Sequence, residues 1–277
     1  MRCIKLEIEY NGGKFFGFQK QKTKGSVQES LEKAICAICQ EPAVVIGAGR
    51  TDAGVHAIGQ VCHFRTSSQI SCANLLRGLN SFLAPDIVVR NVEEVPVWFH
   101  ARYSAKGRAY FYFILNRPYP SALLAPYSHW IFQSLNVDLM NRACQYLMGE
   151  KDYSGFKAAG SGGKNNMVLV RNAFCSRAHE LIPFSDSSSL GSFGSVFSNL
   201  SQEIIIFYIE ADRFLYRMAR NIVGTLIEIG REKKKVDVVE KILSSKNRGT
   251  AGPTAPPNGL FLAKVFYSDI SEKNRSL

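Results

Sequence analysis

Extended segments alternate with amphipathic helical segments along this chain of 277 residues, and the order repeats in a second half. In residues 4–10 apolar and charged side chains alternate, which predicts a strand with one buried face. Ser26 and Glu29 form a capping box, and apolar residues recur at helical spacing after it. The first half is therefore expected to contain strand, helix, strand, strand, helix and strand, with the later elements at 43–47, 60–64, 71–79 and 87–95.

The second half begins near Ser104 and shows the same alternation. Asn136 is placed to cap a helix, and Gly149 stands where a glycine would end it. A long helix is expected over 214–229, with a short one at 236–244. Strands are expected at 109–116, 167–177, 203–211 and 260–267.

Strands and helices that repeat in two halves predict an α+β fold, in which helices cover one side of mostly antiparallel sheets. We divide the chain into an N-terminal α/β half at 1–104 and a C-terminal α/β half at 105–277. Within the second half, the segment 183–201 is rich in serine and glycine and is expected to be a mobile loop.

The chain is strongly basic. It has 34 Lys and Arg against 23 acidic residues, which gives a net charge of +11. Such a protein commonly binds a polyanion such as nucleic acid, although composition alone leaves a merely basic soluble protein equally open. No run of about 18 apolar residues predicts a membrane span, and the N-terminus lacks the apolar core of a secretion signal. An odd number of cysteines, seven, favours reduced thiols in a cytoplasm.

Two of these cysteines, Cys36 and Cys39, form a C-x-x-C pair inside the first predicted helix. No second pair at zinc spacing accompanies them. Packing in the core is therefore the expected role, and metal or redox chemistry is the less favoured alternative.

The stretch GAGRTDAGVHA, from Gly47 to Ala57, is the most informative part of the sequence. It follows a predicted buried strand, and its three glycines predict a tight, exposed loop on a rigid support. This stretch also contains Arg50, Asp52 and His56. One interpretation is a site that uses the carboxylate of Asp52. The alternative is a turn in which Asp52 bonds its own backbone.

Two glycine-rich stretches come close to nucleotide-binding motifs and depart from both. Residues 47–52 begin like G-x-G-x-x-G, but Asp52 replaces the third glycine and no helical pattern follows. Residues 160–164 lack the leading glycine and the Ser or Thr of a phosphate loop. We therefore expect no nucleotide cofactor.

Arg213, Arg217 and Arg220 are spaced so that they share one face of the long predicted helix, near its N-terminal end. A phosphate-binding surface and a solvated basic face are both open interpretations of this cluster and of Lys233, Lys234 and Lys235, which follow it. The helix dipole disfavours cations at a helix N-terminus. Because the arginines gain no stability from that position, a functional reason for them is favoured.

GRTDAGVHA resembles the signature of the TruA-type pseudouridine synthases, and further blocks similar to that family follow in order. The resemblance covers nearly the whole chain, apart from the segment 183–201. In addition, YNGG and Phe18 stand where the family usually has YDGT and Trp. The similar blocks are YNGGKFFGFQKQ…SVQESLEKAI (10–35), FHARYSAKGRAYFYFILN (99–116), DYSGF (152–156), FLYRMARNIVGTLIEIG (214–230) and TAPPNGLFLAKVFY (254–267).

The resemblance implies the pseudouridine synthase fold and an enzyme that isomerises uridine to pseudouridine at positions 38, 39 and 40, in the anticodon stem-loop of tRNAs. Asp52 matches the family's nucleophile, and Arg50 matches an arginine that fills the space of the flipped nucleotide. Tyr110 matches a tyrosine that contacts the target base, and Arg220 matches an arginine that would pair with Asp52. The family also implies a homodimer that uses no cofactor and no metal.

Elementary chemistry agrees with these roles. A carboxylate can act as a covalent nucleophile, and a nearby arginine favours its ionised form. Removing a base from a stem costs a few kcal/mol, which basic and aromatic contacts can offset. The alternative is a basic RNA-binding protein without chemistry. Asp52 favours the enzyme, because a pure binder gains nothing from an acid that faces phosphates.

Overall fold

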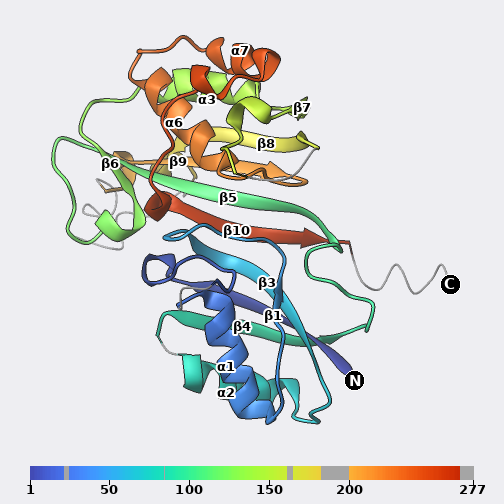
Figure 1. The fold of residues 1–277 in the computed structure, drawn as a ribbon. Coiled ribbons are helices and arrows are strands. Elements are labelled where there is room, and N and C mark those ends of the chain that lie inside the picture. The colour runs from blue at the N-terminus through green and yellow to red at the C-terminus, as the bar shows by residue number, and fades with distance from the viewer. Residues whose placement is uncertain (22–24, 84, 161–164, 182–199, 269–277) are drawn as a thin grey trace. The chain divides into compact units, whose positions relative to one another are not determined.

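The computed structural model describes residues 1–21, 25–83, 85–160, 165–181 and 200–268. The chain forms two compact units (Figure 1). The first consists of Met1–Ala109 with Phe261–Leu277, and the second of Tyr110–Leu260. The sequence predicted a division between residues 104 and 105 that leaves the last strand in the second half, whereas nearly all of that strand belongs to the first unit.

The sheet of the first unit has the strand order β4-β1-β3-β10. Antiparallel pairing joins β1 to both β3 and β4, while β10 runs parallel to β3. The short strand β2 lies beside β3. The bounds are β1 (Arg2–Tyr10), β2 (Ile46–Gly47), β3 (His56–Thr66), β4 (Ile87–Val95) and β10 (Leu260–Tyr267).

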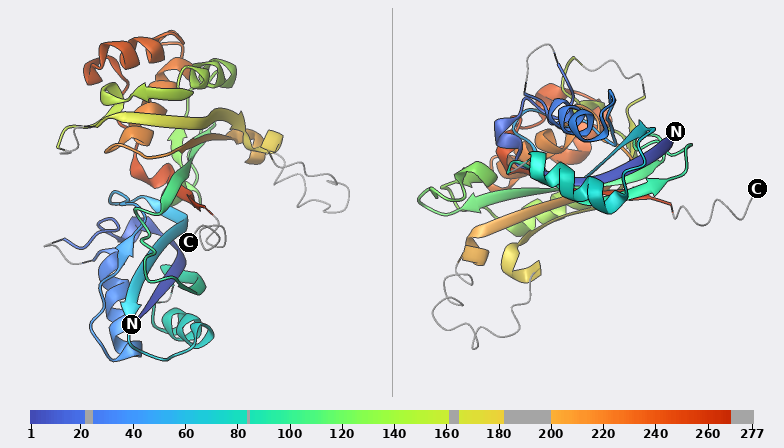
Figure 2. Two further views of the ribbon diagram at one scale, coloured as in Figure 1. Left: turned by 90° about the vertical axis from the view of Figure 1, so that its right-hand side faces the viewer. Right: turned by 90° about the horizontal axis from the view of Figure 1, so that it is seen from below.

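Helices α1 (Val27–Cys39) and α2 (Cys72–Leu83) pack against each other on one face of this sheet (Figure 2). The predicted capping box is confirmed in part. The Oγ atom of Ser26 accepts the amide of Glu29 at 3.2 Å, but the Glu29 carboxylate accepts the amide of Gly25 instead of that of Ser26. Apolar side chains of both helices are fully buried, and the core of this unit lies between the helices and the sheet.

One strand of the first unit was predicted too long. Of residues 43–47, only Ile46 and Gly47 are a strand. The side chain of Val44 is 70% exposed and that of Val45 only 2%, so the apolar run does not form one continuous buried strand. The predicted strand at 60–64 is shorter than β3. The first four residues of β3 follow the glycine-rich loop directly and lack a clear alternation of apolar and polar side chains.

The sheet of the second unit has the order β5-β9-β8-β7, with β6 parallel to β5. β8 pairs antiparallel with both β7 and β9. The mostly antiparallel pairing, with helices packed on the sheets, confirms the predicted α+β class. The bounds are β5 (Ala105–Asn116), whose first five residues belong to the first unit, β6 (His129–Ile131), β7 (Gly149–Asp152), β8 (Met167–Arg177) and β9 (Ile204–Ala211).

Helix α6 is the centre of the second unit's core, because eleven of its residues are buried. It packs against α3, and Gly230 at its end allows this, since a Cβ there would lie 2.7 Å from the sulfur of Met140. The helices are α3 (Val137–Gln145), α4 (Ala178–Leu181), α6 (Met218–Gly230) and α7 (Val238–Ser245), with single 3-10 turns at Gly12–Lys14 in the first unit and at Ala125–Tyr127, Ser154–Phe156, Arg248–Thr250 and Pro257–Gly259 in the second.

Two predicted helix ends in this unit are wrong. Asn136 does cap α3, through its Oδ1 and the amide of Leu139 at 3.1 Å, but α3 ends at Gln145 and Gly149 begins β7 with a φ of +89°. The long helix begins at Met218 instead of 214, because Arg217 adopts a left-handed conformation with a φ of 57°. The serine-rich loop predicted at 183–201 lies almost wholly outside the described residues.

Candidate active site

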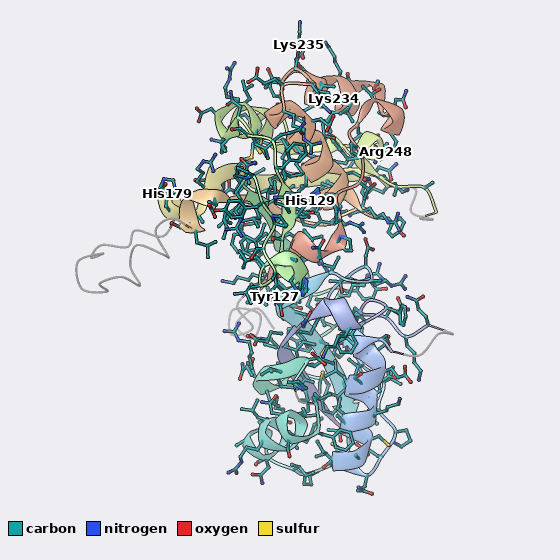
Figure 3. All side chains as sticks on the ribbon, turned by 90° about the vertical axis from the view of Figure 1, so that its left-hand side faces the viewer. Tyr127, His129, His179, Lys234, Lys235 and Arg248 are labelled. Carbon is teal, nitrogen blue, oxygen red and sulfur yellow. The ribbon has the colours of Figure 1, made fainter. Side chains whose placement is uncertain are left out.

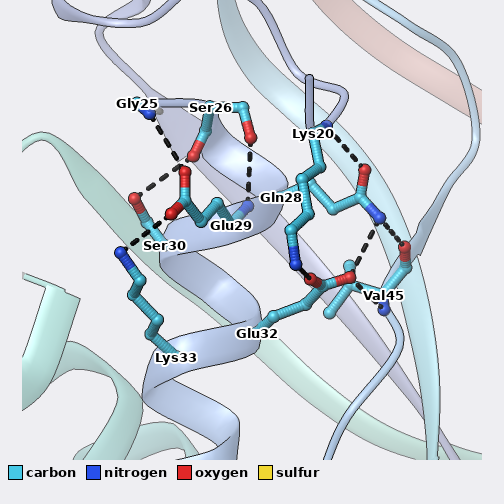
Figure 4. A network of polar contacts seen from close by, with 9 residues as sticks. All are labelled: Lys20, Gly25, Ser26, Gln28, Glu29, Ser30, Glu32, Lys33 and Val45. Atoms are coloured by element: carbon cyan, nitrogen blue, oxygen red, sulfur yellow. Dashed lines mark hydrogen bonds and ion pairs between the residues drawn. The ribbon is translucent and has the colours of Figure 1, made fainter. Parts of the chain in front are cut away.

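The first unit holds the glycine-rich loop on which Asp52 lies. The chain enters it through Val45, which α1 fixes in place (Figure 4). The carboxylate of Glu32 accepts the amide of Val45 at 3.2 Å, and the side-chain amide of Gln28 donates to the Val45 carbonyl at 3.0 Å. The next two residues pair with β3, so the loop starts from a rigid position.

Three further hydrogen bonds hold the first part of the loop. The amide of Ala48 donates to Val61 at 2.7 Å, and the side chain of Gln60 donates to the carbonyl of Gly49 at 2.9 Å. The guanidinium of Arg108 donates to the carbonyl of Ala48 at 2.7 Å. The sequence alone did not single out Arg108, although it lies in the block around Tyr110 that resembles the family.

Hydrogen bonds also hold the residues next to Asp52. The hydroxyl of Thr51 is 2.8 Å from the hydroxyl of Tyr10, and the Thr51 carbonyl accepts the amide of Phe18 at 3.2 Å. The carbonyl of Asp52 accepts the amide of Val55 at 3.1 Å, which closes the turn. Asp52 itself is half-buried, and Arg50 is exposed. The backbone on both sides of the Asp52 carboxylate is thus fixed by several independent contacts.

His56 belongs to the same motif but has a structural role. Its side chain is buried, its Nδ1 accepts the amide of Gly12 at 3.1 Å, and its ring stacks on Phe261 with centroids 4.6 Å apart. A Cβ on Gly12 would lie 1.9 Å from the carbonyl oxygen of Val55, so only glycine fits this approach. The histidine therefore anchors the end of the loop.

In the second unit, Tyr110 and Arg220 lie on β5 and in the first turn of α6. Tyr110 is 7% exposed, and Phe214 meets it edge-on with ring centroids 4.7 Å apart. The Nε of Arg220 donates to the carbonyl of Ala255 at 2.8 Å, and the amide of Ala255 donates back to the carbonyl of Arg220 at 3.1 Å. The contacts with Phe214 and Ala255 thus hold the side chains of Tyr110 and Arg220 in place within this unit.

Arg213 and Arg217 do not share a helix face with Arg220, and that prediction was wrong. Both precede α6, because the left-handed turn at Arg217 delays the helix. Arg213 is ion-paired with Asp212 at 3.5 Å, and the guanidinium of Arg217 lies 5.0 Å from the ring centre of Tyr216. The helix-dipole argument therefore does not apply to Arg213, whereas Arg217 is the N-cap residue of α6 and lies at the positive end of the helix dipole.

The three lysines follow α6 in the turn that leads to α7, where Figure 3 labels Lys234 and Lys235. Lys233 and Lys235 are exposed. Lys234 is half-buried, and its Nζ donates to the carbonyl of Thr250 at 3.0 Å. Nearby, Lys241 and Lys246 are paired with Asp237 and Asp152, which reduces the free positive charge that the sequence indicated.

The structure therefore distributes the predicted residues over both units. Arg50 and Asp52 belong to the first, and Tyr110, Arg220 and the remaining basic residues belong to the second. Within the described ranges, no group of three or more His, Cys, Asp or Glu side chains is arranged to hold a metal. All seven cysteines are free, and Cys36 is exposed on α1, so core packing was the wrong expectation for it.

Among the described residues, none of the helices has the length and apolar character that crossing a membrane requires.

A fixed glycine-rich loop that carries an aspartate and an arginine, on an α+β fold with mostly antiparallel sheets, is the combination expected of a pseudouridine synthase. The chain belongs to the tRNA pseudouridine synthase family, whose model matches residues 7–104 and 143–268. It is 39% identical to a tRNA pseudouridine synthase A of Acetivibrio thermocellus over 267 residues, which cover 96% of this chain and all of the relative. It is 40% identical to the protein of that name from Hydrogenovibrio crunogenus, over 99% of this chain and 96% of the relative. These matches confirm the resemblance and the pseudouridine synthase fold.

Proposed function

We propose that this protein isomerises uridine to pseudouridine at positions 38, 39 and 40 in the anticodon stem-loop of tRNAs. The observation that carries the proposal is Asp52 on a loop fixed at Ala48, Gly49 and Thr51. The match to tRNA pseudouridine synthases over nearly the full length supports the substrate class.

In the proposed reaction Asp52 is the nucleophile. Its carboxylate attacks ribose C1′ and forms an ester there as the bond between C1′ and uracil N1 breaks; after the base rotates, C5 attacks C1′, and the ester bond breaks and releases the carboxylate. The proton lost from C5 is balanced by a proton gained at N1. Substrate and product are isomers, so the reaction needs no oxidant and no hydrolysis, and we propose that it proceeds without a cofactor or metal.

The other predicted residues complete the proposal. Arg50, which is exposed, fills the space that the flipped nucleotide leaves, and Tyr110 contacts the target base. Arg220 pairs with the Asp52 carboxylate, as the resemblance to the family implies. The N-terminal half at 1–104 supplies the nucleophile, and the C-terminal half at 105–277 supplies the tyrosine and the basic residues. Arg213, Arg217 and the three lysines contact phosphates.

We further propose a cytoplasmic homodimer. The free cysteines support a reducing compartment, and the dimer follows from the resemblance to the family. The mass of the protein in solution, measured by light scattering at several concentrations, tests the dimer directly.

The experiment that tests the function is incubation with unmodified tRNA transcripts, followed by mapping of pseudouridine at single-nucleotide resolution. We expect modification at positions 38 to 40 and at no other uridine. A transcript with cytidine at all three positions is the matched control. Binding without any pseudouridine would favour the alternative, a non-catalytic RNA-binding protein.

A further inference from the structure

The loop between β4 and β5, residues 96–104, exposes two aromatic side chains. The relative exposure of Tyr103 is 78%, the highest among the aromatic residues described, and that of Trp98 is 47%. The loop belongs to the first unit, as does Asp52. Exposed tyrosine and tryptophan rings are suited to stacking on the bases of a nucleic acid.

This loop is fixed from beneath by buried groups. Phe99 and Ala101 are buried, and the Nδ1 of His63 accepts the amide of Ala101 at 3.2 Å. The hydroxyl of Tyr267 donates to the carbonyl of Ala101 at 2.7 Å. Because the backbone is already ordered, this loop loses little conformational entropy when a ligand binds.

His100 shapes the part of the loop that carries Tyr103. Its Nδ1 accepts the amides of both Arg102 and Tyr103 at 3.2 Å. Its ring packs on Tyr103 with centroids 4.3 Å apart, at an angle of 31°. The tyrosine ring is thus supported by a second ring, yet it remains largely open to solvent.

The charge around this loop is positive. Residues 96–108 contain three basic residues and no acidic residue. The guanidinium of Arg102 lies 5.8 Å from the ring centre of Tyr103, and Arg65 of β3 donates to the carbonyl of Val97 at 3.1 Å. Both arginines are exposed. Aromatic rings beside arginines suit a nucleotide, whose base stacks while its phosphate is attracted by the cations.

Arg108 connects this loop to the loop of Asp52. One guanidinium nitrogen, Nη2, donates to the carbonyl of Ala48 at 2.7 Å and to the carbonyl of Arg102 at 3.2 Å. A nucleotide held on Tyr103 would therefore be held in a fixed relation to Asp52.

We propose that Trp98 and Tyr103 form a stacking platform for unpaired bases of the bound RNA, with Arg65 and Arg102 attracting the adjoining phosphates. The inference rests on the proposed function, since tRNA is the RNA that supplies these bases. It adds a recognition surface to the first unit, beyond the roles proposed for Asp52 and Arg50.

The test is equilibrium binding of unmodified tRNA to the full chain, with Tyr103→Leu and Tyr103→Phe compared with wild type. Leucine removes the aromatic face, and we expect affinity to fall about tenfold, with an unchanged dependence on salt, because stacking releases few ions. Phenylalanine keeps the face, and affinity should stay within about twofold. Since Tyr103 is exposed, both variants should melt like wild type. Wild-type affinity in the leucine variant, or equal weakening in both variants, would overturn the platform.

Trp98 provides a second readout, because the chain has only two tryptophans. In a Trp130→Phe background, Trp98 is the sole source of tryptophan emission, and tRNA should quench it. Unchanged emission at saturation would overturn the part assigned to Trp98. A change of oligomeric mass in Tyr103→Leu would instead identify this loop as a contact between two copies of the chain and would overturn the proposal.

Binding is measured without turnover, so the two proposals fail separately. A protein that binds tRNA through Tyr103 but forms no pseudouridine contradicts the proposed function alone. An active enzyme whose Tyr103→Leu variant binds normally contradicts the platform alone. Wild-type protein that binds no tRNA contradicts both.

Discussion

The hydroxyl groups of Tyr10 and Thr51 form a buried hydrogen bond of 2.8 Å between the end of β1 and the residue before Asp52. We expect Tyr10→Phe to lower the rate of pseudouridine formation about tenfold, because small displacements of a reacting group are costly. The loss of stability should be about 1 kcal/mol. Tyr153→Phe is the matched control, since it also removes a buried hydroxyl, one that donates to Leu147 in the second unit. If both variants retain full turnover, the bond to Thr51 does not position Asp52.

Gly17 has a φ of +88°, and a Cβ there would lie 2.7 Å from the carbonyl oxygen of Thr51. Gly17→Ala should therefore destabilise the protein by about 3 kcal/mol, through backbone strain and displacement of the Asp52 loop. Gly149 has the same kind of φ, +89°, with nothing within 4 Å of a Cβ. Gly149→Ala should cost about 1 kcal/mol only. Denaturant unfolding of both variants gives the comparison, and equal destabilisation would contradict the close approach of Gly17 to Thr51.

Burial, followed by the nearby His100, lowers the pKa of His63 to about 4. The neutral form is favoured in the folded state, so the stability that this histidine contributes is present above its ordinary pKa of 6.5 and is lost as the pH falls toward 4. His63→Gln keeps an acceptor for Ala101 without a titrating group. Between pH 7 and pH 4, wild type should lose up to about 3 kcal/mol more unfolding free energy than this variant. Parallel decreases would show that His63 does not titrate in this range.

Lys233 and Lys235 are the exposed members of their cluster, whereas Lys234 is held by Thr250. The double variant Lys233→Glu, Lys235→Glu should flatten the log–log dependence of tRNA affinity on salt by about one unit for each phosphate that the protein no longer neutralises. Charge reversal of Lys20 and Lys33, which are exposed and paired with Glu32 and Glu29, changes the net charge equally and is the control. The same slope in both variants would mean that the cluster near α7 is only a solvated face.

The positions of most strands could be predicted from the sequence, because the alternation of apolar and polar residues depends directly on which side chains are buried. The bounds of β4, β8 and β10 agree with the predicted ranges, although the alternation is interrupted in β4 and β8, where the strand pairing shifts register. Helix ends were less accurate, because they depend on single backbone conformations. Nothing in the composition around Arg217 indicates the left-handed turn that delays α6, and the φ of Gly149 serves the start of β7 instead of the end of α3.

The candidate loop around Asp52 could be identified from its residues, but its supports could not. Tyr10, Phe18 and Arg108 are far from Asp52 in the sequence, and their side chains look like ordinary strand or loop residues until the fold brings them to Thr51 and Ala48. The aromatic loop at 96–104 was likewise visible only as part of a family block. Its importance depends on the exposure of Tyr103, and the periodicity of apolar residues in the sequence does not indicate that exposure.

The central claim, that Asp52 is the nucleophile, is tested most directly by single-turnover pseudouridine formation in Asp52→Asn. Asparagine keeps the size of the side chain and most of its hydrogen-bonding capacity but removes the anion. The variant should melt like wild type and bind tRNA at least as well, because one negative charge that faces the RNA is gone. It should form no detectable pseudouridine. Turnover within about tenfold of wild type, or about 1.4 kcal/mol in the barrier, would contradict the assignment.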